Sequence, residues 1–372
     1  MGRIFLIGDT HIALGFPNKA DKWFKVHKQY FKEFLIPKLK ELVEPGDIIV
    51  HLGDLFDNRT IIPINLMNFA MDMIEEISKI APLHMLVGNH DSWAKSASEV
   101  NTIRPFKYIP NVFVYDQTTR VEYGGHKLLM MPYVHHKKEQ IMLIDDNKDC
   151  DYLFCHSDLN GCKMHFSSVA HKNLNKIDIN DFASFKKVFS GHIHIVQRER
   201  NFTFVGSNFQ MDRGDMGDQK GILVLDPSTG DEQFIPNKIS PVFRKIYVNT
   251  EDDIMNLYEV DDTDYLDLFI SNTLLMSNRK IRRKLEIVLE QKNFETIDYI
   301  DDVVEKVEEG VEPEEDDSDV TEIDISVTLD YEDYIKEYIN KQKFNSEEFK
   351  EGLLEEYDEV IRIYREEFKS KA

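Results

Sequence analysis

Hydrophobic positions follow two different periods along the first part of the chain. Short apolar runs such as Arg3–Ile7 and Asp47–Leu52 predict buried strands that end in polar turns. The stretch Asp21–Val43 carries apolar side chains at helical spacing along one face, and Pro37 predicts a kink in that helix. A further helix is expected at 64–79, and further strands at 84–87, 112–115, 119–123, 127–131, 152–155, 187–189, 202–205, 221–225 and 233–236.

Strand–helix alternation gives way to mostly strands toward the end of this region. That order predicts an α/β fold, a layered β-sandwich flanked by helices, over residues 1–238. Residues 239–300 form a smaller unit, with expected strands at Val242–Val248 and Tyr265–Ile270 and a helix at Ser277–Gln291. We expect this unit to be a small α+β capping domain.

The chain beyond residue 300 differs in composition from the rest. Between Asp301 and Asp324, thirteen acidic residues and one lysine give a local charge of −12, which predicts a flexible acidic linker over 301–328. Apolar residues at helical spacing then predict two amphipathic helices within 329–372. Two such helices behind a linker cannot bury both apolar faces alone. They either fold back on the body or dock on a partner, and we favour the partner.

Charge and composition narrow the classes of protein that this chain can belong to. The formal net charge of −23, from 68 acidic and 45 basic side chains, argues against a uniform nucleic-acid-binding surface, but about half of it belongs to the linker. No run of about 18 apolar residues exists, and the N-terminus has no apolar region of a signal peptide. Three cysteines are too few for a disulfide framework. We therefore expect a cytoplasmic protein without a membrane segment.

Metal-ligand residue types stand at the ends of five predicted strands. The segments are Gly8-Asp9-Thr10-His11, Gly53-Asp54, Gly88-Asn89-His90-Asp91, His156 and Gly191-His192-Ile193-His194. Any one of them alone is more often a turn or a chance alternation, but their order and spacing together indicate a metal centre. Ligands collect at the carboxyl ends of strands, so these segments should converge. Carboxylate, amide and imidazole ligands suit manganese, iron or zinc, and the carboxylate of Asp54 is the natural bridge between two ions.

These five segments resemble the signature of the calcineurin-like metallophosphoesterases, over roughly residues 1–235. The resemblance implies that one divalent ion takes Asp9, His11, Asp54 and His194. It implies that the other takes Asp54, Asn89, His156 and His192. His90 matches the catalytic histidine of the family, and Asp91 is expected to hold the His90 ring by a hydrogen bond. In the implied mechanism, two cations activate a water for in-line attack on phosphorus, while His90 stabilises or protonates the leaving oxygen.

Within that superfamily the chain is most similar to the SbcD-type DNA repair nucleases, including recombination endonuclease subunits of T-even-type phages. The likeness rests on Gly53–Arg59, Val87–Asp91, Gly191–His194, Phe204–Ser207 and Phe234–Asn237. It implies a manganese-dependent nuclease, with magnesium as the alternative metal, that has 3′-to-5′ exonuclease action on duplexes and endonuclease action on single strands. It also implies work on DNA ends in recombination and break repair, in the host cytoplasm if the protein is phage-encoded.

The same likeness implies two partners besides DNA. One is a second copy of the chain in a homodimer, and the other is an SMC-like ABC-type ATPase held by the C-terminal helices. The sequence has no Gly-x-x-x-x-Gly-Lys-Ser/Thr loop, so any ATP dependence must come from that partner. Cellular members often have histidine where Asp57 stands, and we expect Asp57 to orient Arg59.

DNA contacts require local positive charge in so acidic a chain. Candidates are Arg59 and a run at the start of the capping-domain helix, comprising Arg279, Lys280, Arg282, Arg283 and Lys284. The alternative for that run is a solvated helix end. Two rival functions remain: a phosphatase or nucleotide phosphodiesterase with the same dimetal centre, and an ATPase-docking scaffold with weak chemistry. The complete ligand set argues against the scaffold.

Overall fold

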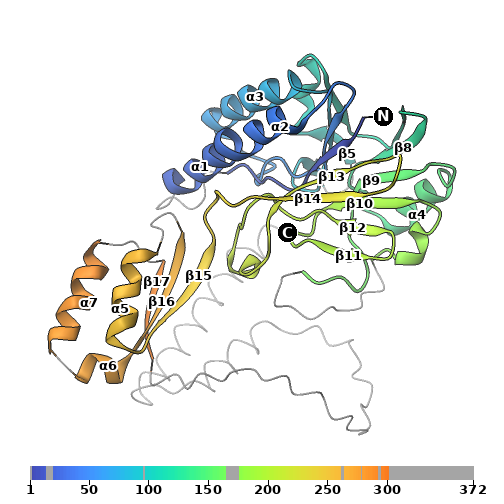
Figure 1. Cartoon of the computed structure of the whole chain (residues 1–372). Helices are drawn as coiled ribbons and strands as arrows, with labels where there is room; N and C mark the ends of the chain where they lie inside the picture. Colours follow the sequence, from blue (N-terminus) through green and yellow to red (C-terminus); the bar gives the residue numbers. More distant parts are fainter. Residues whose placement is uncertain are drawn as a thin grey trace, which may run out of the picture. The chain divides into compact units, whose positions relative to one another are not determined.

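The computed structural model of the chain describes residues 2–13, 20–94, 97–164, 176–260, 264–277, 279–291 and 295–300 (Figure 1). The expected acidic linker (301–328) and helical tail (329–372) lie outside the described residues. Within the described ranges, no helix combines the length and the apolar character that crossing a membrane requires.

Two six-stranded sheets lie at the centre of the first 236 residues. One has the strand order β14-β13-β1-β2-β3-β6, and the other has the order β11-β12-β10-β9-β8-β7. The strands of the first sheet are β1 Ile4–Ile7, β2 Ile48–His51, β3 Leu83–Leu86, β6 Val112–Tyr115, β13 Gly221–Leu225 and β14 Glu232–Pro236. Those of the second are β7 Thr119–Tyr123, β8 His126–Met131, β9 Tyr152–His156, β10 Lys187–Gly191, β11 Gln197–Glu199 and β12 Phe202–Phe204. A separate hairpin pairs β4 (Ser92–Ala94) with β5 (Ala97–Asn101).

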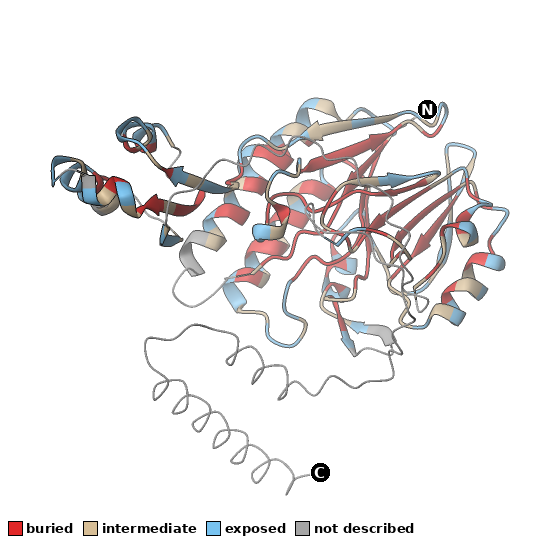
Figure 2. Ribbon diagram, turned by 90° about the horizontal axis from the view of Figure 1, so that it is seen from below, coloured by how far each residue is buried: buried red, intermediate tan, exposed pale blue. Residues whose placement is uncertain are grey.

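The two sheets pack face to face as a sandwich. A cluster of apolar side chains from both sheets, among them Leu6, Val50, Phe154 and Phe189, is fully buried between them. The inner strands β1, β2, β3, β9 and β13 are buried along their whole length, and Figure 2 shows such buried strands at the centre of the sandwich. Each residue of such a strand faces either the other sheet or the covering helices, which explains why the strands are apolar runs rather than alternating patterns. The predicted α/β layered sandwich is confirmed.

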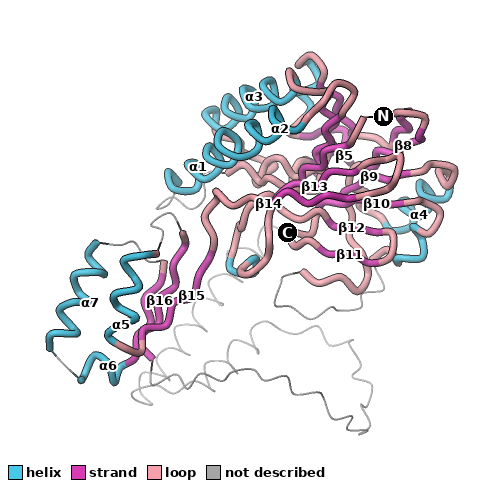
Figure 3. Tube along the Cα trace, in the orientation of Figure 1, coloured by secondary structure: helices cyan, strands magenta, loops and turns pink. Residues whose placement is uncertain are grey.

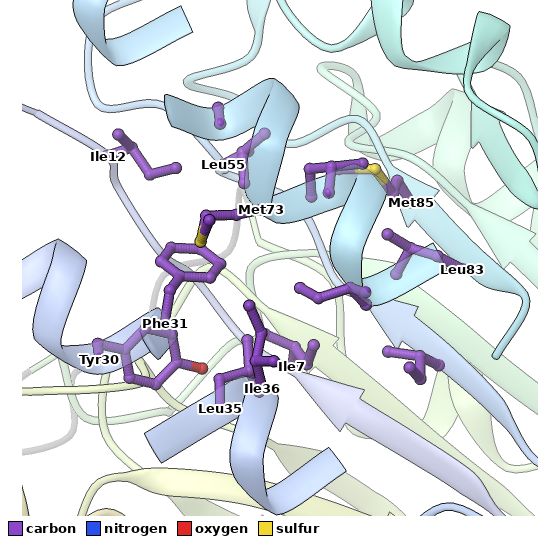
Figure 4. Close-up of a cluster of buried hydrophobic side chains, with 14 of the residues drawn as sticks. Ile7, Ile12, Tyr30, Phe31, Leu35, Ile36, Leu55, Met73, Leu83 and Met85 are labelled. Atoms are coloured by element: carbon purple, nitrogen blue, oxygen red, sulfur yellow. The ribbon is translucent and has the colours of Figure 1, made fainter. Parts of the chain in front are cut away.

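Helices cover the outer face of the first sheet. They are α1 (Ala20–Gln29), a π-helical segment (Tyr30–Leu35), α2 (Ile36–Leu42) and α3 (Ile64–Ser78). Phe31 and Met73, both labelled in Figure 4, belong to the apolar cluster that joins these helices to the sheet. The expected kink at Pro37 takes the form of the π-helical turns just before it. Proline lacks an N–H and crowds the carbonyl one turn earlier, and a wider turn relieves both problems.

The outer face of the second sheet has its own buried cluster, to which Phe182, Phe202 and Leu153 contribute. It is covered by α4 (Lys137–Asp145) and by a short 3-10 helix, Ile179–Phe182. The remaining 3-10 helices are Arg104–Tyr108, Arg213–Asp215 and Leu257–Glu259.

Residues 243–300 contain a three-stranded parallel sheet in the order β15-β16-β17. Its elements are β15 Phe243–Val248, β16 Tyr265–Ser271, β17 Thr296–Ile300, α5 Glu251–Asn256, α6 Asn272–Ser277 and α7 Arg279–Gln291. All three helices lie on one side of this sheet (Figure 3). They bury Val248, Leu268 and Ile270, so alternate residues such as Tyr247 and Phe269 project from the opposite side. Arg213 of the preceding loop pairs with Asp267 of β16 through two contacts of 2.5 and 2.7 Å.

Candidate metal centre

The five segments predicted to converge do meet in the structure. β1, β2 and β3 are parallel neighbours in one sheet, and β9 and β10 are parallel neighbours in the other. Their carboxyl ends lie together, and each is followed by one of the five segments. Three groups of side chains there have ligand atoms within 4.8 Å of one another. The groups are Asp9 with His11 and His194, Asp54 with His156 and His192, and His11 with Asp57 and His90.

The first group surrounds the Nε2 atoms of two histidines. His11 Nε2 lies 3.2 Å from His194 Nε2, and the latter lies 3.6 Å from Asp9 Oδ2. Asp54 Oδ2 is 3.6 Å from His11 Nε2 and 3.2 Å from His156 Nε2. The Asp54 carboxylate therefore stands between the first and the second group, where a bridging ligand has to be.

The second group is organised around an amide oxygen. Asn89 Oδ1 lies 2.8 Å from His156 Nε2 and 2.8 Å from His192 Nδ1. His156 Nδ1 donates to the carbonyl of Leu52 at 2.8 Å, and this hydrogen bond directs Nε2 toward the position of a cation. His192 is oriented in the same way by a carboxylate, because its Nε2 lies 3.0 Å from Asp158 Oδ1.

The backbone around these ligands is strained. His11, Asp54 and His192 have positive φ angles of 44°, 54° and 82°, a region that side chains with a Cβ rarely occupy. The backbone at Gly88 also lies very close to Asp54 of the neighbouring loop. A Cβ on Gly88 would come within 2.1 Å of Asp54 Oδ1, so only glycine fits there. Such angles reduce local stability, yet three of the expected ligands have them. We infer that these loops are shaped to place the three side chains.

The electrostatics of the cluster fit divalent cations. Burial opposes a charged imidazole, but the neighbouring carboxylates outweigh it and raise the pKa of His11 to about 9 and that of His156 to about 10. Burial raises the pKa of Asp9, which is fully buried. The protein alone must thus place protons on ligand histidines to balance its carboxylates, and cations would supply that positive charge instead. All seven expected ligands belong to this arrangement.

His90 lies beside the cluster, and one backbone carbonyl orients its ring. Its Nδ1 donates to the carbonyl of Asp57 at 2.7 Å, so Nε2 is the ring atom available to a substrate oxygen. The Asp57 carboxylate lies 3.4 Å from His11 Nδ1 and 3.9 Å from His90 Nδ1. The expectation that Asp57 orients Arg59 is therefore wrong. Asp57 contacts the two histidines because the chain turns sharply after Asp54.

The expected contact between Asp91 and the His90 ring is also wrong. The Asp91 carboxylate is fully buried and accepts hydrogen bonds from the backbone N–H groups of Asp54 (2.8 Å), Leu55 (3.1 Å) and Gly88 (3.0 Å). It thereby ties the loop after β2 to the loop after β3. Burial and the charge of Asp54 raise the pKa of Asp91 to about 6. Asp91 shapes the site through the backbone and does not hold the His90 ring.

Several supporting residues were not found from the sequence. Asp158 follows His156 by two positions, and its contact with His192 depends entirely on the fold. His51 Nε2 lies 2.8 Å from Thr10 Oγ1, directly behind the Asp9–His11 loop. Lys220 is buried, and its Nζ donates to the carbonyl of His194 at 2.6 Å. None of them lies in a motif, and the sequence indicated only that His51, within a predicted strand, is a core or supporting residue.

The five expected DNA-contact residues of α7 are not brought to the metal centre, whereas Arg59 lies closer to it. Arg279, Lys280, Arg282, Arg283 and Lys284 are exposed on α7. α7 covers the side of its sheet opposite to Tyr247 and Phe269. Arg59 is half-buried, and its charge reaches Tyr133, whose pKa burial raises, and His135, whose pKa burial lowers. The Tyr133 ring lies 5.7 Å from that of His192, which places Arg59 near the second group.

A cavity of about 810 Å³ opens onto the metal centre. Its lining includes His11, Asp54, Asn89, His90, His192 and His194 on one side. Two cations here would supply Lewis-acid activation of a water and of a phosphate oxygen. The chain itself supplies the oriented ligands, the free ring atom of His90 and a cavity next to both. This arrangement is suited to hydrolysis of a phosphoester.

The family model for calcineurin-like phosphoesterases matches residues 2–196, so the chain belongs to that family. Phosphoesterases of this family use divalent metal ions, and the two clusters offer ligand atoms of the kinds required. The chain is a hydrolase of phosphoesters by membership in this family.

Three curated viral proteins are similar in sequence. Exonuclease subunit 1 of Enterobacteria phage T4 is 26% identical over 363 residues, which cover 95% of this chain and 96% of that protein. The putative phosphoesterase 244L of Invertebrate iridescent virus 6 is 30% identical over 67% of this chain and 86% of its own length. The putative phosphoesterase 078R of Invertebrate iridescent virus 3 is 26% identical over 56% of this chain and 57% of its own length. The predicted likeness to metallophosphoesterases, and among them to a phage nuclease subunit, is confirmed.

Proposed function

We propose that this protein is a DNA nuclease that depends on two divalent metal ions and processes DNA ends during recombination and double-strand break repair. The observation that carries the proposal is the convergence of two ligand groups on Asp54, with His90 beside them and a large cavity in front. The near full-length similarity to a phage exonuclease subunit supports DNA as the substrate.

In the proposed centre, Asp9, His11 and His194 hold one ion with Asp54, and Asn89, His156 and His192 hold the other with the same carboxylate. Manganese suits this mixed set of oxygen and nitrogen ligands, with magnesium as the alternative. His90 presents Nε2 to the leaving oxygen, and the Asp57 carbonyl on Nδ1 keeps the ring in that orientation.

The phage relative is one subunit of an exonuclease, which supports the proposal that this chain also works with partner proteins. We propose a homodimer that works with an SMC-like ABC-type ATPase, gripped by the tail at 329–372 beyond the acidic linker. The exposed basic residues of α7 are proposed to contact the DNA backbone away from the reacting phosphate, and Arg59 is proposed to contact it closer to the metal centre. Exonuclease action on duplexes and endonuclease action on single strands are both part of the proposal.

The test is digestion of an end-labelled DNA duplex with Mn²⁺, comparing the wild type with His90→Asn. His126→Asn is the matched control, because His126 lies on β8 beside Asp151, 3.7 Å away, and outside the metal clusters. We expect cleavage by the wild type and by His126→Asn, and loss of cleavage in His90→Asn. Equal cleavage by all three proteins would refute the assigned site.

A second candidate function is hydrolysis of small phosphoesters, as a phosphatase or nucleotide phosphodiesterase. The cavity favours it, because about 810 Å³ is in the range of small-molecule sites. Rapid hydrolysis of a small phosphodiester without cleavage of any DNA would favour this candidate. If the wild type is inert on every phosphoester, also with the ATPase present, the protein is a docking scaffold instead.

A further inference from the structure

The cavity at the metal centre has a second, apolar half. It is lined by Trp23, Ile62, Leu66, Met211, Phe243 and Tyr265. These side chains come from α1, from α3 and the segment that leads into it, from the loop after β12, and from the two strands β15 and β16. A phosphate bound at the metal centre does not need such a wall, because its contacts are with ions and polar groups. The apolar half therefore has to receive another part of the substrate.

The rings of Trp23, Phe243 and Tyr265 lie next to one another in this wall. Phe243 and Tyr265 are stacked, with ring centroids 4.6 Å apart and planes at 22°. Trp23 lies 5.9 Å from Tyr265. The ring of His27 is 5.7 Å from Trp23, and its Nε2 is 2.8 Å from the carbonyl of the ligand His11. The aromatic wall is thus connected to the metal centre through two direct contacts.

The charge of the lining decides what this half can accept. Among the described residues that line the cavity, Arg213 carries the one permanent positive charge, and Asp267 pairs with it through two contacts. Asp212 and Glu295 bring carboxylates to the same rim. Such a surface repels further phosphates of a nucleic-acid backbone and favours a flat, neutral group.

We propose that the apolar half binds the base of the nucleotide next to the scissile phosphodiester, so that the strand is unpaired at the point of cleavage. The inference rests on the proposed nuclease function and adds the state of the substrate. A base can stack on aromatic rings only when it has left the duplex stack. Stacking on a ring face tolerates all four bases, which suits a nuclease without sequence preference.

The first test changes the substrate and leaves the protein unaltered. A single-stranded oligonucleotide is compared with the same strand that has one abasic nucleotide, and cleavage with Mn²⁺ is mapped at each bond. We expect kcat/KM at the bonds flanking the abasic nucleotide to fall by about 5- to 150-fold, the range for losing one base–aromatic stack, with distant bonds unaffected. Equal cleavage at all bonds would overturn the proposed base site and leave the nuclease function standing. Cleavage of neither strand would count against the nuclease function itself.

The second test asks whether the ring of Phe243 is the one that the base contacts. Phe243→Ala should slow cleavage beside a normal nucleotide several-fold and leave cleavage beside the abasic nucleotide unchanged. Tyr247→Ala is the control, because Tyr247 lies on the same strand, is exposed, and stacks on Phe269 outside the cavity. It should affect neither rate. Equal slowing of both rates by Phe243→Ala would show a merely structural role and overturn the assignment.

Discussion

Removal of the buried ammonium of Lys220 should lower both the free energy of unfolding and the affinity for metal. Its Nζ donates to the carbonyl of His194 at 2.6 Å and lies 2.8 Å from Asp215 Oδ1 and 3.0 Å from Asp218 Oδ2. The side chain is 3% exposed, so water cannot replace these contacts. The other Asp215 oxygen accepts from the backbone N–H of Met211, in the loop that lines the cavity. Lys220 therefore supports a ligand and the cavity wall together.

Lys220→Met keeps the length of the side chain and removes its charge. Two carboxylates and a carbonyl then stay buried without their cation. Loss of one partner from a buried ion pair costs about 3–5 kcal/mol of unfolding free energy, because the remaining charge is uncompensated. The same change frees the His194 backbone, so we also expect weaker binding of the metal ion that His194 holds. Adding Asp215→Asn removes one of the unpaired charges and should recover part of the lost stability.

Urea unfolding at pH 7 measures the first effect, and calorimetric titration with Mn²⁺ measures the second. Lys187→Met is the matched control, because Lys187 pairs with Glu232 at 2.6 Å while 31% of its side chain is exposed. A pair of that kind contributes about 0–1 kcal/mol. If Lys220→Met costs no more than Lys187→Met and binds Mn²⁺ as the wild type does, the reasoning from burial is refuted.

Three further predictions concern the site and the core. His90→Asn should keep its metal, because neither of the two groups proposed to hold the ions, around Asp9 and around Asn89, includes His90, and lose about 10²- to 10⁴-fold in turnover; metal analysis together with rate measurement checks both. Gly88→Ala should bind Mn²⁺ more weakly in calorimetry, because the added Cβ comes within 2.1 Å of Asp54 Oδ1. Burial lowers the pKa of His84 to about 4, so the unfolded chain takes up the proton first as the pH falls. Between pH 7 and 5 this should remove about 2 kcal/mol of stability, a loss that His84→Gln lacks in parallel urea titrations.

The sequence by itself determined the class of the fold and which side chains meet at the candidate metal centre. Short apolar runs are local patterns, and the strands they predicted agree with those observed to within a residue or two, as at Val112–Tyr115 and Gly221–Leu225. Ligands such as Asn89 and His192 follow strand ends directly. Because parallel strands bring their carboxyl ends to one edge, strand order was enough to predict that these segments meet.

Only the tertiary structure decided how the supporting groups are used. Asp91 is adjacent to His90 in sequence, yet its carboxylate turns inward to backbone N–H groups of the Asp54 loop. Lys220 and Asp158 reach ligands from distant or unpatterned positions. The direction of a side chain from a turn depends on φ and ψ there, and His11, Asp54 and His192 have positive φ angles that no local sequence pattern predicts. A local sequence pattern does not encode contacts between distant loops. The meeting of the five segments was therefore predictable, whereas the contacts of Asp91, Lys220 and Asp158 were not.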